Sequence, residues 1–172
     1  MRSIVWTAVA AFLLTSGGAD AGEKVAAVSQ AETPHEEKAA AAFARAASLA
    51  GLFDVEAAQL ALDRATNPEI RKLAREIVED QSLANSRLVA FAPKHAVTRL
   101  NADYTARLNR LKAAKAEAFD KAFLAAQQAS HDHSAKLLSD YAHSGGDDRL
   151  RSYASETLSF VKLHQSRVKS LQ

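Results

Sequence analysis

Two pairs of neighbouring residues, Thr33-Pro34 and Asn67-Pro68, constrain the fold of this chain more than any other feature. The side-chain oxygen of the first residue can accept a hydrogen bond from a backbone amide of the next helical turn. Proline suits the first turn of a helix because its missing N–H would have no partner there. Glu36, three residues after Thr33, completes a capping box. The two pairs therefore predict that long helices begin at Pro34 and at about Glu69.

The later helix boundaries are marked by similar signals. Pro93 ends the second helix because proline cannot continue one. Asn101 can cap a short helix, Gly145-Gly146 predicts a left-handed exit from a long one, and Asp147 or Asp148 can cap the last. The predicted helices run from about Pro34 to Arg64, from Glu69 to Pro93, from Asn101 to Lys112, from Glu117 to His143 and from Asp148 to Leu171.

Four long helices with short connections predict an all-α domain over residues 34–172, an antiparallel four-helix bundle with a short extra helix between helices two and three. Aromatic residues are only 6% of the chain, which favours closely packed helices over a sheet. Apolar residues also recur every three or four positions. The stripes are Ile70, Leu73, Ala74, Ile77, Ala84, Leu88 and Phe91 in helix two, Phe119, Phe123, Ala126, Leu137 and Tyr141 in helix three, and Leu150, Ala154, Thr157, Val161, Val168 and Leu171 in helix four.

Residues 1–21 have the features of a secretory signal peptide. Arg2 supplies a positive charge, residues 4–14 are apolar, and Ala19-Asp20-Ala21 provides the small residues of a cleavage site before Gly22. The alternative, an uncleaved anchor, is less favoured because a membrane-spanning helix needs roughly 20 apolar residues. We therefore expect a periplasmic or secreted protein with a flexible lead-in over residues 22–33 and no stable membrane span after cleavage.

The composition argues against several classes of function. The chain has no cysteine, so it has neither a thiol nucleophile nor a disulfide. Its 22 basic and 20 acidic residues nearly balance and alternate along the chain, which argues against nucleic-acid binding. No G-x-S-x-G turn or glycine-rich phosphate loop is present. We expect a non-enzymatic protein, associated with the cell envelope or with stress, whose partner is another protein or a second copy of itself.

Each long helix contributes one polar residue that the stripes predict to point inward. These residues are Glu56, Gln81, His133 and His164. His131 and His133 are two residues apart, and such residues point about 200° apart on a helix, so the pair cannot hold one metal ion together. We expect His131 to be solvated and His133 to face the core.

The four inward residues allow two interpretations. In the first, which is favoured, neutral histidines hydrogen-bond a buried glutamate and glutamine, and no cofactor is present. In the second, Glu56, His133 and His164 bind a divalent metal, with Gln81 and Asp132 as neighbours. A ferritin-type di-iron centre is not expected, because it needs Glu-x-x-His on two helices. The only such spacing, Glu32 to His35, lies at a helix entrance.

Four segments of the chain carry a resemblance to a known family. They are DVEAAQLALDRATNPEIRKLAREIVED (54–80), SLANSRL (82–88), AFDKAFLAAQQASHDHSAKLL (118–138) and LRSYASETLSFVKLHQSRV (150–168). They resemble the ferritin-like domain of unknown function 4142, whose bacterial members are often described as outer-membrane or periplasmic proteins. The resemblance implies a ferritin-like bundle and no established enzymatic activity.

The resemblance also matches individual positions. Members of the family usually carry Asp-His in helix two, followed by an asparagine one turn later. This chain has Asp80-Gln81 and Asn85 there, so one characteristic histidine is replaced. Asp132-His133 matches the corresponding pair in helix three, and His164 matches the histidine of helix four.

Overall fold

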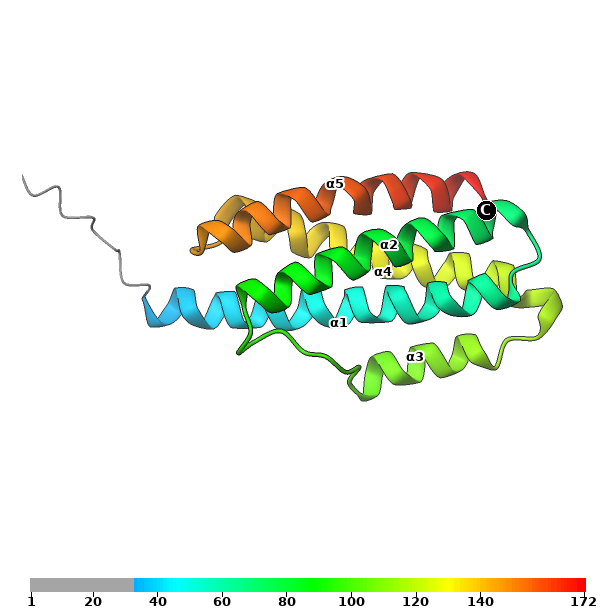
Figure 1. Ribbon diagram of the computed structural model, residues 1–172, viewed down its shortest axis with the longest axis horizontal. Helices are drawn as coiled ribbons and strands as arrows, with labels where there is room; N and C mark the ends of the chain where they lie inside the picture. Colours follow the sequence, from blue (N-terminus) through cyan, green and yellow to red (C-terminus); the bar gives the residue numbers. More distant parts are fainter. Residues whose placement is uncertain (1–32) are drawn as a thin grey trace, which may run out of the picture. The chain divides into compact units, whose positions relative to one another are not determined.

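The computed structural model describes residues 33–172, which form five helices and no strand (Figure 1). The helices are α1 (Pro34–Arg64), α2 (Pro68–Phe91), α3 (Ala102–Lys112), α4 (Ala116–Ser144) and α5 (Asp148–Ser170). The all-α prediction is confirmed. The predicted signal peptide (1–21) and all but the last residue of the predicted lead-in (22–33) lie outside the described residues. Among residues 33–172, no helix is both long and apolar enough to cross a membrane.

Side-chain hydrogen bonds confirm the predicted starts of four helices, whereas α4 begins at Ala116 without such a bond. Thr33 Oγ1 accepts from the amide of Glu36, and a carboxylate oxygen of Glu36 accepts from the amide of Thr33 at 2.8 Å. These two bonds form the predicted capping box. Side-chain oxygens of three further residues accept from amides in the first turn of α2, α3 and α5: Asn67, Asn101 and Asp147.

The exit from α4 differs from the prediction. Gly145 has φ −65° and ψ 145°, an extended conformation rather than a left-handed one. Its amide donates to the carbonyl oxygen of Tyr141 at 2.8 Å. A Cβ atom at Gly145 would overlap the ring of Tyr141. Glycine is therefore required here for space and not for a positive φ.

The four long helices form a helical bundle. α1 packs against α2 and α4, and α5 packs against the same two helices. Their buried apolar residues form two clusters, one that includes Phe53 and one that includes Phe43. In α2, Gln81 lies between Ile77 of the first cluster and Ala84 of the second. Buried polar residues therefore lie where the two apolar clusters meet.

The short helix α3 lies beside the bundle, next to α1 in Figure 1, and packs against α1 and α4. Only Leu108 and Leu111 of α3 are buried. The guanidinium of Arg64, at the end of α1, donates to the carbonyl oxygens of Leu111, Lys112 and Ala114. These bonds fix the end of α3 against the bundle while most of its side chains remain exposed.

Candidate functional site

A layer of polar side chains crosses the core between the two apolar clusters. Every member is buried, and all four long helices contribute. We call this set the polar layer: Asp54 of α1, Gln81 of α2, Gln127, Ser130, His131 and Ser134 of α4, and His164 of α5. The predictions that Gln81 and His164 point inward are confirmed.

The burial of His131 and His133 in α4 is the reverse of the prediction. His131 is fully buried, whereas His133 is exposed. The Nδ1 of His131 donates to the carbonyl oxygen of Gln127 at 2.8 Å, and its ring meets that of His164 edge to face, with the ring centroids 5.4 Å apart. Seen down the helix axis, both histidines lie roughly 80° from buried Phe123, on opposite sides. The packing of α5 covers the side that carries His131.

The inward carboxylate of α1 is Asp54, and the prediction that Glu56 fills this role is wrong. Asp54 is fully buried and accepts a hydrogen bond from Gln81 Nε2 at 3.5 Å, whereas Glu56 is half-buried. Leu52 and Leu60, one turn before and one turn after Glu56, are also only half-buried and flank the buried face, which is rich in alanine. That face lies so close to α2 that a Cβ atom at Gly51 would overlap the side chain of Asn85. Most of the residues that α1 buries are therefore small, with Phe43, Leu49 and Phe53 as the large apolar exceptions.

Burial changes the acid–base behaviour of the polar layer. It raises the pKa of Asp54 above its usual value, although the charge of His131 and the hydroxyl of Ser130 act to lower it. Burial, followed by repulsion from His131, lowers the pKa of His164 to about 4. The Nε2 of His164 lies 3.0 Å from a carboxylate oxygen of Asp80, which acts in the opposite direction. His164 is therefore neutral at pH 7.

Asp132, the predicted neighbour of the metal site, lies at the surface. Its Oδ1 accepts from the side-chain amides of Gln128 and Gln165, both at 2.6 Å. The bond from Gln128, with help from Gln165, lowers the pKa of Asp132 although burial acts to raise it. Asp132 therefore links the surfaces of α4 and α5.

The structure does not bring the predicted metal ligands together. Glu56 is half-buried on α1, His133 is exposed on α4, and His164 is enclosed in the polar layer. In the described part of the chain, no three histidine, aspartate or glutamate side chains are placed to hold one metal ion. Metal binding by these residues stays a prediction.

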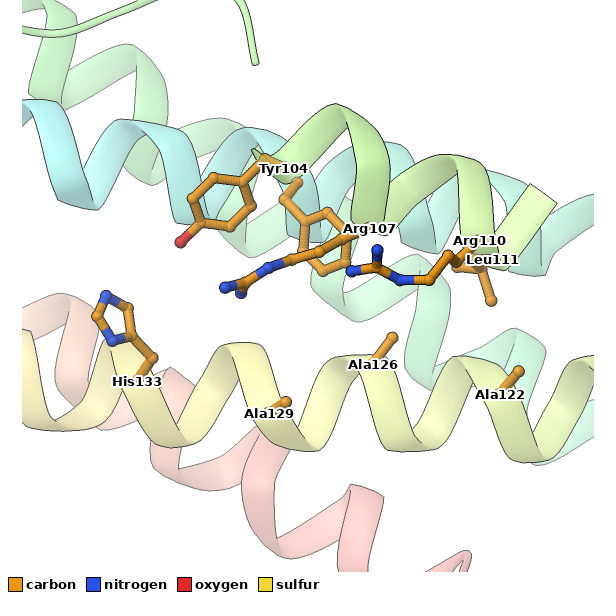
Figure 2. Close-up of a pocket in the computed structure, with 9 residues that line it drawn as sticks. Tyr104, Arg107, Arg110, Leu111, Ala122, Ala126, Ala129 and His133 are labelled. Carbon is orange, nitrogen blue, oxygen red and sulfur yellow. The ribbon is translucent and has the colours of Figure 1, made fainter. Parts of the chain in front are cut away.

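A groove of about 570 Å³ runs between α3 and α4 (Figure 2). We call it the α3 groove. One wall comes from α3, the other from α4, and Phe53 of α1 contributes to the base. The lining residues are Phe53, Tyr104, Arg107, Arg110, Leu111, Ala122, Ala126, Ala129 and His133.

Apart from the hydroxyl of Tyr104, the polar side chains of the α3 groove are basic. Figure 2 shows the side chains of Arg107 and Arg110 between α3 and α4, with His133 on the opposite wall. The guanidinium carbon of Arg107 lies 5.0 Å from the centre of the Tyr104 ring. This site was not predicted from the sequence. The local signals were two arginines three residues apart on one helix and alanines at matching spacing on another, but only the tertiary structure joins the two helices.

These features define the protein as an all-α helical bundle with a polar layer in its core and a basic groove on its side. Residues 25–171 match the family described as Domain of unknown function (DUF4142). The chain belongs to this family, and the resemblance is confirmed. No curated protein and no solved structure matches the chain.

Proposed function

We propose that this protein is an exported, non-enzymatic, ferritin-like four-helix bundle that binds a small molecule in the α3 groove. The observation that carries the proposal is the contrast between its two polar sites. Asp54, His131 and His164 are fully buried, so a substrate has no access to them, whereas a catalytic acid or base must come within hydrogen-bond distance of its substrate. The α3 groove is accessible and combines an apolar base with a few convergent polar groups, as ligand sites usually do.

Filling the groove tests the binding function. We expect Ala129→Leu to weaken binding of the apolar fluorescent probe N-phenyl-1-naphthylamine about tenfold, because a leucine would occupy space between α3 and α4. Ala118→Leu is the matched control, since Ala118 is also exposed on α4 but does not line the groove. Fluorescence titration measures both affinities. Equal binding by the wild type and both variants would place the probe elsewhere and refute the proposal.

The proposed export implies a role in the cell envelope, including a stress-associated one. Export has its own test. When the full chain is expressed in a bacterium, we expect the periplasmic fraction to contain a protein that begins at Gly22, because residues 1–21 combine a positive charge, an apolar segment and a small-residue cleavage site. Intact mass identifies the cleavage point. Deletion of residues 2–21 is the control and should leave the protein in the cytoplasm. An uncleaved cytoplasmic wild-type chain would contradict the prediction.

Metal binding is a second candidate function, and one observation favours it. The Nδ1 of His131 carries the proton that it donates to a carbonyl oxygen, which leaves Nε2 with a lone pair when the ring is neutral. Neither His131 Nε2 nor His164 Nδ1 has a hydrogen-bond partner among residues 33–172. An unprotonated imidazole nitrogen is a common metal ligand. Elemental analysis of His131→Ala and His133→Ala separates this candidate from the first.

A further inference from the structure

We propose that the α3 groove binds an amphiphilic organic anion, a small molecule with a carboxylate or sulfonate head and an apolar chain or ring system. This inference rests on the proposed function and names the ligand class of the same site. It follows from the arrangement of charge, apolar surface and volume in the groove.

The positive charge lies on one wall. Arg107 and Arg110 are three residues apart on α3, so they project from the same side of the helix. Both are exposed, and neither forms an ion pair with a carboxylate among residues 33–172. Two neighbouring guanidinium groups attract an anion, and each can donate two parallel hydrogen bonds to a planar carboxylate. The anionic head of the ligand therefore binds at these two arginines.

Tyr104 provides a further donor near the arginines. Figure 2 shows its hydroxyl directed towards the end of the groove where His133 lies. Burial, reinforced by the charge of Asp54, raises the pKa of the Tyr104 hydroxyl, against the opposite effect of Arg107. The hydroxyl therefore stays protonated at neutral pH and can donate to an anionic head.

The apolar surface lies at the base and on the opposite wall. Phe53 and Leu111 are buried beneath the groove. Ala122, Ala126 and Ala129 are spaced four and three residues apart, so they form one row on α4. Because their side chains are small, they leave space between α3 and α4. The volume of about 570 Å³ lies within the range of roughly 300 to 1,000 Å³ that is usual for small-molecule sites.

The lining has no group that would repel an anion. None of the lining residues is acidic, and three of them are arginine or histidine: Arg107, Arg110 and His133. A neutral apolar ligand would gain only the contacts of the base and the alanine row. An anion with the same apolar part would add charge-assisted hydrogen bonds, each of which contributes more than a neutral one.

Two probes that share one ring system test this assignment. 1-Anilinonaphthalene-8-sulfonate carries an anionic head, and N-phenyl-1-naphthylamine lacks it. We expect the wild type to bind the sulfonate about tenfold more tightly than the neutral probe, and Arg107→Gln/Arg110→Gln to remove this preference while leaving neutral-probe affinity within about twofold. Arg45→Gln/Arg75→Gln is the control, because it removes the same charge from exposed residues outside the groove. Each protein is purified after expression of the full chain. Fluorescence titrations then measure its affinity for both probes.

The outcomes separate the inference from the proposed function. Equal wild-type affinity for the two probes, or sulfonate binding that survives Arg107→Gln/Arg110→Gln, would overturn the anion assignment and leave groove binding in place. An equal loss of sulfonate binding in the control pair would overturn it as well, since the attraction would then come from net charge. If Ala129→Leu weakens neither probe, binding in the groove is itself refuted.

Discussion

Replacing His131 with alanine is expected to lower the free energy of unfolding by about 2 to 4 kcal/mol, whereas the same change at His133 should alter it by less than about 0.5 kcal/mol. His131 is fully buried, donates a hydrogen bond to the Gln127 carbonyl and packs against the ring of His164. Alanine would leave a cavity and remove this side-chain hydrogen bond, although the Gln127 carbonyl keeps its helical bond to the amide of residue 131. His133 is exposed on the same helix, so its replacement by alanine removes few contacts. Urea denaturation followed by circular dichroism measures both values.

The two histidine variants also decide between the candidate functions. A larger loss of stability in His133→Ala than in His131→Ala would contradict the burial of these residues. Elemental analysis of the same proteins tests metal binding. If the wild type retains zinc, iron, copper or manganese and either variant loses it, the metal candidate is supported. If no protein retains metal and only His131→Ala is destabilised, the polar layer is a structural cluster.

Acidification is expected to destabilise the fold through His164, with a contribution of about 3 kcal/mol between pH 6.5 and pH 4. Burial lowers the pKa of His164 from 6.5 to about 4 in the folded protein. Between these two pH values the unfolded chain binds a proton at this histidine and the folded protein does not. Stability due to His164 is therefore complete above pH 6.5 and decreases as the pH falls towards 4. Chemical denaturation at a series of pH values measures this dependence.

His164→Gln should remove most of this slope, while the exposed His133→Gln should retain it. Asp54 acts in the opposite direction. Its pKa is raised by burial, so its ionised form costs stability near neutral pH and protonation in acid recovers part of that cost. The net loss in the wild type is therefore smaller than the contribution of His164 alone. Equal pH slopes in the wild type and in both variants would show that His164 is not the group responsible.

Helix boundaries were predictable because they depend on residues close together in the sequence. Thr33, Asn67 and Asn101 each cap a helix with a hydrogen bond to an amide two or three residues away. The inward positions of Gln81 and His164 were predictable as well, since each continues an apolar row with no competing row on its helix.

The inward residues of α1 and α4 were not predictable in the same way. α1 carries apolar residues on several faces, so the sequence does not show that α2 approaches the alanine-rich one and buries Asp54 instead of Glu56. On α4, His131 and His133 flank the buried stripe almost symmetrically. Helical periodicity alone does not distinguish between two such positions.

The class of fold, the places where helices begin and the family of the chain therefore follow from local sequence signals. The location of the candidate sites depends on how the helices pack. α5 packs against the side of α4 that carries His131 and encloses it, whereas α3 lies across from His133 and leaves a groove between them. The physical reason is that a helix sets the direction of each side chain, but only its neighbours in space determine which directions are closed to water.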